Sequence, residues 1–109
     1  MAAKYETVLI YAGEFSSSGR KPDVKPRCAE LKTGGNKEVL WVTVPPGLNF
    51  TVKFDKEKGS PFEETVLSGV GIIKSGPIKV NPKGKDEFYA YTLEVDNHEI
   101  IDPGIIIWD

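Results

Sequence analysis

The chain has one histidine, one cysteine and one methionine among its 109 residues, so the side chains that most often carry metal or nucleophilic chemistry are nearly absent. They are His98, Cys28 and Met1. A single cysteine cannot form a disulfide within the chain. Because disulfides belong to oxidising compartments, this composition favours a cytoplasmic rather than an exported protein.

Long apolar runs and an excess of basic charge are missing as well. No apolar run approaches the ~20 residues that cross a bilayer. Lys and Arg number 14 against 16 acidic residues, a net charge of −2, which supplies no basic face for nucleic acid. We expect neither a membrane nor a nucleic-acid partner. The first residues also lack the pattern of a signal peptide, although a leader trimmed before residue 1 stays compatible with them.

Glycine and proline are abundant instead, at 11 and 8 residues, and no window shows the 3.6-residue period of a helix. The many turns predict short strands, at the spacing typical of an all-β sandwich. The length suits one domain over residues 1–109. We expect seven or eight mostly antiparallel strands, drawn from the following segments: Tyr5–Ala12, Arg27–Leu31, Glu38–Val44, Asn49–Asp55, Glu64–Leu67, Ile72–Val80, Glu87–Val95 and Ile105–Trp108.

Two of these segments alternate cleanly between apolar and polar residues. Phe50, Val52 and Phe54 share one side of Asn49–Asp55, and four large side chains from Tyr89 to Val95 share one side of Glu87–Val95. Each strand is therefore expected to have one buried and one solvated face. The longest connection, 13–26, is either functional or loosely ordered, and it has room for a short extra strand.

Three segments are apolar on both sides, which is unusual for an antiparallel sandwich. They are 8–11, 39–44 and 105–108. If Trp41 points inward, its neighbours on the strand point outward, whereas the opposite parity exposes Trp41 itself. Burying a side chain of this size is worth about 1.5–3 kcal/mol. Either the 13–26 loop covers the outward side chains, or a partner does. The predicted contact residues are Leu9, Tyr11, Leu40, Val42, Val44, Ile106 and Trp108, with the last strand able to pair with another chain if it lies at an edge.

The strand order, the loop-rich first third, and the tyrosine-rich strand before a short aliphatic last strand together resemble the cupredoxin family. The resemblance implies a Greek-key sandwich in which the first and third strands share one sheet and the last strand belongs to the other. It also implies a copper site, with Cys, His and Met ligands in the loop that corresponds to Asp96–Gly104. An immunoglobulin-like sandwich is the alternative, since Trp41 suits it, but the paired cysteines of that fold are absent.

The ligand count excludes the copper chemistry that this resemblance would imply. A blue-copper site needs two imidazoles and a thiolate, and this chain has one histidine. Asn97 and His98 instead suit the centre of a tight hairpin turn. Cys28 follows Arg27, which favours a lowered thiol pKa, but its position within a short strand predicts a small buried hydrophobe.

No residue pattern points to catalysis, and we expect no enzyme, no cofactor and no metal. The sequence predicts a copper-free sandwich that binds another protein or a second copy of itself. The alternative is a calcium or small-ligand site in the loops at one end. Its candidate oxygen ligands are Asp96, Asn97, Glu99 and Asp102, joined by Asp55 or Glu57 if their loop lies nearby.

Overall fold

The computed structural model describes residues 5–16, 21–33, 37–80, 84, 86–95 and 97–108, with the backbone alone at position 102. These residues form strands and one short 3-10 turn, and they contain no α-helix. The elements are β1 (Tyr5–Tyr11), η1 (Gly13–Phe15), β2 (Asp23–Lys25), β3 (Cys28–Lys32), β4 (Glu38–Val44), β5 (Asn49–Phe54), β6 (Val66–Val70), β7 (Ile72–Lys74), β8 (Glu87–Val95) and β9 (His98–Trp108). The prediction of an all-β chain is confirmed.

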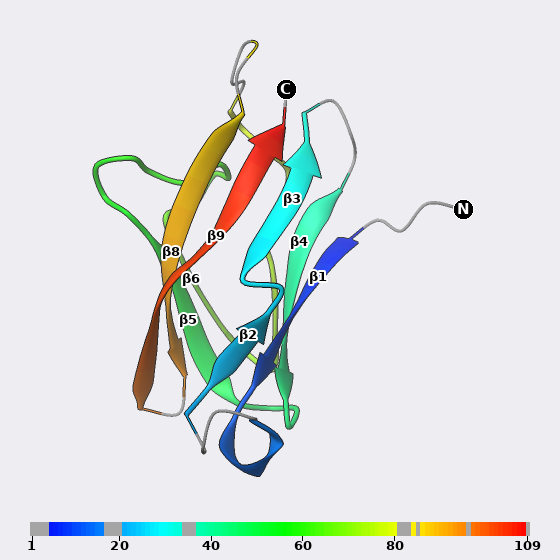
Figure 1. The fold of residues 1–109 in the computed structure, drawn as a ribbon, viewed down its shortest axis with the longest axis vertical. Coiled ribbons are helices and arrows are strands. Elements are labelled where there is room, and N and C mark those ends of the chain that lie inside the picture. Colours follow the sequence, from blue (N-terminus) through cyan, green and yellow to red (C-terminus); the bar gives the residue numbers. More distant parts are fainter. Residues whose placement is uncertain are drawn as a thin grey trace.

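The strands form two mixed sheets packed against each other as a β-sandwich (Figure 1). The four-stranded sheet has the order β2-β1-β4-β7, and the five-stranded sheet has the order β3-β9-β8-β5-β6. Most neighbouring strands are antiparallel, but β1 runs parallel to β4, and β3 runs parallel to β9. The first and third of the expected strands, β1 and β4, therefore share a sheet, and the last strand lies in the other.

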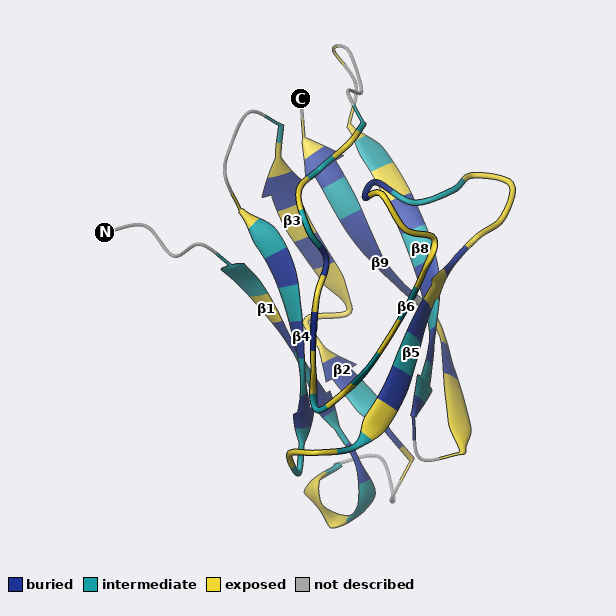
Figure 2. Cartoon of the chain, turned by 180° about the vertical axis from the view of Figure 1, so that it is seen from behind, coloured by how far each residue is buried: buried dark blue, intermediate teal, exposed yellow. Residues whose placement is uncertain are grey.

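The core lies between the sheets and follows the period-two pattern of the strands, which Figure 2 shows as alternating bands of burial. Phe50, Val52 and Phe54 are buried on β5, as the alternation of that segment predicts. The large side chains of β8, from Tyr89 to Val95, are buried as well. Trp41 on β4 is fully buried and meets β8 across the sandwich, so both sheets contribute to a single core.

Several predicted strand boundaries are wrong. The expected strand at 64–67 begins and ends later, as Val66–Val70. The expected strand at 72–80 ends at Lys74; Ser75 still bonds to Val39 of β4, and Gly76–Pro77 follows without strand structure. The 13–26 connection does hold a short extra strand, β2, which pairs with β1.

The largest difference from the prediction concerns the last strand, which begins at His98 rather than at Ile105. Asp102–Pro103–Gly104 reads as a strand breaker in the sequence. In the fold this stretch sits inside β9, where the register against β8 shifts between Ala90 and Thr92. A bulge of this kind absorbs a proline within a central strand, so the pairing continues on both sides of it.

No helix in the described part of the chain is long and apolar enough to cross a membrane.

Candidate interaction surfaces

Five of the seven predicted contact residues lie together on the outer face of the four-stranded sheet. Val8, Ile10, Val39 and Trp41 point into the core, so the alternate residues of β1 and β4 point away from it. The parallel register pairs Leu9 with Val42 and Tyr11 with Val44, and Leu40 lies level with Thr7. We call this surface the apolar face; it consists of Leu9, Tyr11, Leu40, Val42, Val44 and Ile72.

Ile72 was not among the predicted contact residues. The antiparallel register of β4 and β7 sets it beside Val42, and its side chain is 52% exposed. The sequence contained a signal for Ile72. Adjacent residues of a strand point to opposite faces, so only one of Ile72 and Ile73 can enter the core and the other must point outward. Ile72 and Thr7 are exposed on this side of the sheet, and the other five residues of the apolar face are partly exposed. Within the 13–26 loop, η1 lies at the end of the sheet (Figure 1), and β2 lies along the sheet edge beside β1.

Charged residues stand at the margins of the apolar face. Lys25 of β2 lies over the ring of Tyr11, with 5.9 Å between the ammonium nitrogen and the ring centroid. Lys74 of β7 lies over the ring of Tyr5 at 5.7 Å. These contacts hold both ammonium groups on the face rather than beyond its edges. An apolar centre with a charged rim is the usual anatomy of a protein interface.

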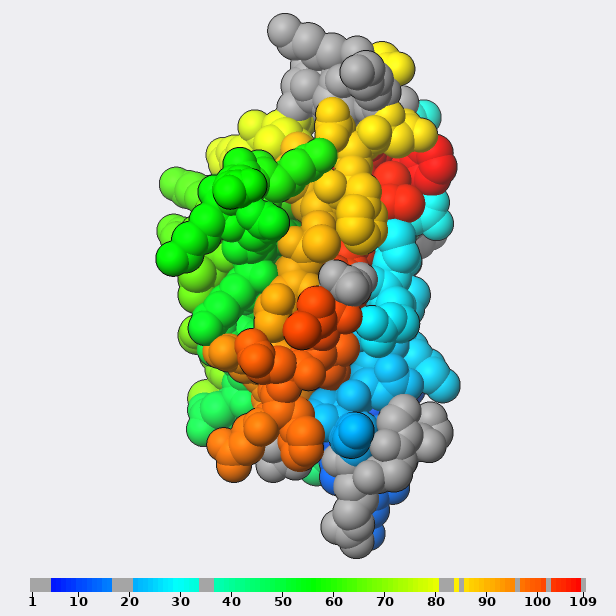
Figure 3. Space-filling model, turned by 60° about the vertical axis from the view of Figure 1, so that its left-hand side comes forward, coloured from blue at the N-terminus to red at the C-terminus, as the bar shows by residue number. Residues whose placement is uncertain are grey.

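The other two predicted contact residues, Ile106 and Trp108, lie on the outer face of the five-stranded sheet, so the predicted surface is divided in two. Ile105 and Ile107 point into the core, which turns Ile106 and Trp108 outward. Figure 3 views the molecule toward this side, with β8 and β9 in yellow to red and β3 in cyan. Phe88, which the sequence reading did not single out, lies beside Ile106 and is 46% exposed.

The last strand does not lie at a sheet edge, so the condition under which it was expected to pair with another chain is not met. Strand β9 lies between β3 and β8, so both of its edges are occupied over residues 104–107, which include most of the predicted strand. The cause is the parallel pairing with β3, which places β3 rather than β9 at the end of the five-stranded sheet. A short run at the end of a chain gives no sign of a parallel partner far upstream in the sequence.

His98 is the first residue of β9 and not a centre residue of the turn. It pairs with Val95, so the two-residue connection consists of Asp96, which lies outside the described residues, and Asn97. Asn97 adopts φ 59°, the left-handed conformation that asparagine tolerates better than most residues. The hairpin prediction is thus correct, but its centre was assigned one residue too late.

Cys28 is exposed, which contradicts its prediction as a buried hydrophobe. Ala29 and Leu31 take the inward positions of β3, so the parity of the strand turns Cys28 outward. Partial burial, and next the nearby carboxylate of Glu30, raise the pKa of the Cys28 thiol, whereas Arg27 had been expected to lower it. The guanidinium of Arg27 instead donates a hydrogen bond to the carbonyl oxygen of Ile101 at 2.9 Å.

The residues do not fit the copper site that the cupredoxin resemblance implies. Cys28 pairs with Gly104, while His98 begins the same strand β9, which separates the thiol and the imidazole by roughly 20 Å along the strand. The loop expected at Asp96–Gly104 is itself mostly strand. No group of three or more histidine, cysteine or carboxylate side chains that could hold a metal occurs among the described residues.

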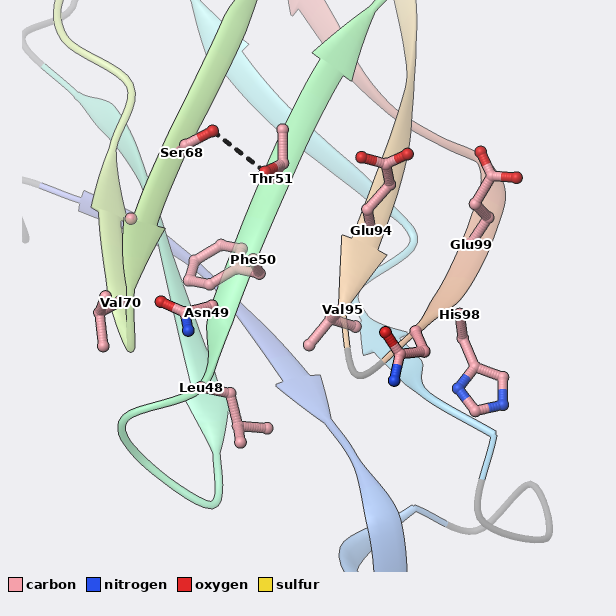
Figure 4. Close-up of a pocket in the computed structure, with 12 residues that line it drawn as sticks. Leu48, Asn49, Phe50, Thr51, Ser68, Val70, Glu94, Val95, His98 and Glu99 are labelled. Carbon is pink, nitrogen blue, oxygen red and sulfur yellow. Dashed lines mark hydrogen bonds between the residues drawn. The ribbon is translucent and has the colours of Figure 1, made fainter.

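A shallow groove crosses the outer face of the five-stranded sheet at the β8–β9 turn (Figure 4). Thr51 and Ser68 share a hydrogen bond between their hydroxyl oxygens at 3.0 Å on one side of it. Glu94 and Glu99 lie beside each other as a cross-strand pair on the other side. Lys53 neutralises Glu94 through a 3.0 Å ion pair, and His98 lies exposed at the margin. The groove therefore offers hydroxyl and carboxylate oxygens on an open surface.

Asp55 and Glu57 do not join the other predicted calcium ligands. Asn97 and Glu99 lie at the β8–β9 turn, but the register pairs Phe54 with Tyr91, so Asp55 lies toward the far end of β8. The carboxylate of Asp55 accepts hydrogen bonds from the backbone N–H groups of Glu57 and Lys58, which satisfies the turn after β5. Asp96 and the side chain of Asp102 lie outside the described residues.

Comparison with known proteins adds no relative: no protein-family model, no curated protein and no solved structure matches this chain. What the chain does must therefore be argued from its own surfaces.

Proposed function

We propose that this chain is a non-catalytic interaction module, a copper-free cupredoxin-like β-sandwich that acts through protein–protein contact on its apolar face. The cupredoxin-like assignment is supported by the sheet orders, in which β1 and β4 share one sheet as a parallel pair and β9 lies in the other. The sheets of immunoglobulin-like sandwiches are antiparallel, and this difference favours the cupredoxin-like alternative.

The observation that carries the proposal is the in-register apolar set on two adjacent strands of one sheet. An outward strand face in an antiparallel sandwich is normally polar, because it meets water. Here Leu9 and Val42 lie side by side, and Ile72 extends the same row. Scattered exposed apolar side chains need no explanation, but a contiguous patch rimmed by charge is typical of a binding surface.

Substitution at the centre of the apolar face tests this function. Val42→Glu adds a charge there without touching the core, and Thr92→Glu is the matched control. Both residues are β-branched, half-buried and outward-facing on an inner strand of their sheet. The immobilised proteins are exposed to cell extract, and the free proteins are measured by light scattering. We expect Val42→Glu to lose the bound protein or second copy that the wild type and Thr92→Glu retain. Equal binding by both variants would rule out the apolar face.

A second candidate function is binding of a small polar ligand in the groove at the β8–β9 turn. The observation that favours it is the cluster of outward oxygens from Thr51, Ser68 and Glu99 on a concave surface. A ligand at 100 times its dissociation constant adds about 2.7 kcal/mol to stability. Thermal melting in millimolar calcium chloride, or in a neutral sugar, tests this candidate. An unchanged melting temperature in both would eliminate these two ligand classes.

A further inference from the structure

Four charged residues lie at two opposite corners of the apolar face. On β2, Asp23 lies level with Tyr11, and Lys25 lies level with Leu9. On the far side of the face, Lys74 of β7 lies level with Leu40, and Glu38 of β4 lies level with Tyr5. Each corner thus carries one ammonium group and, farther out along the strands, one carboxylate.

These four charges have no ion-pair partner in the described part of the chain, although three lysines elsewhere form ion pairs with glutamates. Asp23 accepts a hydrogen bond only from the backbone N–H of Val24 among the described contacts. The two signs balance on this face. A strongly charged partner would favour a surface of one sign, whereas an interface between identical surfaces must be complementary to itself.

Self-complementarity extends to the apolar centre. Two sheets can stack with their strands crossing at about 90°, one of the two arrangements that packed sheets adopt. Consider a second copy of this face, related to the first by a two-fold axis that runs diagonally to the strands. With the strand register of this sheet, Val42 then lies over Val42 of the copy. Leu9 falls on Leu40, and Val44 falls near Ile72. Apolar groups thus meet apolar groups at these positions.

We propose that the apolar face binds a second copy of this chain across a two-fold axis, with the strands of the two copies crossing at about 90°. Lys25 of one copy then lies over Glu38 of the second copy. Asp23 lies over Lys74 in the same way, and the symmetry repeats both contacts. This proposal rests on the proposed function and specifies its partner.

Charge exchange between the two corners tests this arrangement. Lys25→Glu and Glu38→Lys each set like charges against each other at two symmetric contacts. We expect each variant alone to raise the dimer dissociation constant about tenfold or more in sedimentation velocity. An equimolar mixture of the two variants restores both ion pairs, so we expect a heterodimer close to wild-type affinity. Lys32→Glu is the control, since it makes the same charge change at an exposed site of the five-stranded sheet.

Every outcome bears on the proposal. Rescue in the mixture supports it and also shows that both variants are folded. Dimers that persist in each single variant would overturn it, as would single variants that stay monomeric when mixed. A wild-type chain that is monomeric at every concentration overturns self-association alone. The proposed function would stand after that result if Val42→Glu lost a foreign protein that the wild type retains from extract. If Val42→Glu retained that protein as well, the proposed function would fail together with self-association.

Discussion

The indole Nε1–H of Trp41 donates a hydrogen bond to the hydroxyl of Tyr91 at 3.2 Å, and the two rings meet edge to face with their centroids 5.7 Å apart. Trp41 belongs to the four-stranded sheet and Tyr91 to the five-stranded sheet, so the contact joins the two layers at the centre of the core. The same contact satisfies the polar atoms that the two rings bring into an apolar interior, because a buried indole N–H needs an acceptor.

Tyr91→Phe removes this acceptor and leaves the buried N–H of Trp41 without a partner. An unsatisfied buried donor costs about 1–3 kcal/mol, so we expect a loss of that size in the free energy of unfolding at neutral pH. Urea denaturation of the two proteins measures it. A variant as stable as the wild type would contradict the structural role of the hydrogen bond.

The pH dependence of stability supplies a second test of Tyr91. Burial raises the pKa of its hydroxyl from 10.0 to about 12, and the hydrogen bond from Trp41 offsets only part of this. The unfolded chain therefore releases the tyrosine proton at lower pH than the folded protein does, and stability falls as the pH rises from 10 toward 12. The Tyr91→Phe variant does not show this loss of stability, because it has no hydroxyl proton to release at that position. We expect the stability difference between wild type and variant to narrow across that window; a constant difference would refute the raised pKa.

Gly71 connects β6 to β7 and couples backbone geometry to packing. It adopts φ +76°, and a Cβ added there would lie 3.0 Å from the backbone nitrogen of Gly47. Gly76 has a similar φ of +79° but open space around it, so it is the matched control. We expect Gly76→Ala to cost about 1–2 kcal/mol from the left-handed backbone. Gly71→Ala should cost at least about 1 kcal/mol more, from the contact with Gly47. Thermal unfolding compares them, and equal costs would contradict the close approach.

Cys28 should react slowly with alkylating reagents despite its exposure. The thiolate is the reactive form, and partial burial together with Glu30 raises the thiol pKa above its usual value. Glu30→Gln removes the neighbouring charge, so we expect faster alkylation by iodoacetamide at pH 8 in that variant. Rates followed by mass spectrometry decide the question, and an unchanged or slower rate would contradict the effect of Glu30 on the thiol pKa.

The sequence was informative wherever one strand face meets water and the other meets the core. The alternation of residues 49–55 and 87–95 predicted which side chains of β5 and β8 are buried, because a period of two leaves only two possibilities. The same parity argument, applied from Trp41, predicted that Leu40, Val42 and Val44 point outward.

The sequence was uninformative wherever pairing joins distant segments. Nothing local to 98–104 reveals that a bulge accommodates Pro103, or that β3 occupies the edge of β9. The charged corners of the apolar face were likewise inaccessible, since Asp23 and Lys74 become neighbours of the face only through the register of β2 and β7.

Photo-cross-linking from the apolar face tests the central claim most directly. A photoreactive amino acid replaces Val42 in one protein and Thr92 in another, and mass spectrometry identifies the adducts formed in cell extract. Our account predicts an intermolecular adduct from position 42, to a second copy or to another protein, and little from position 92. Adducts of equal yield from both positions, or none from position 42, would contradict it.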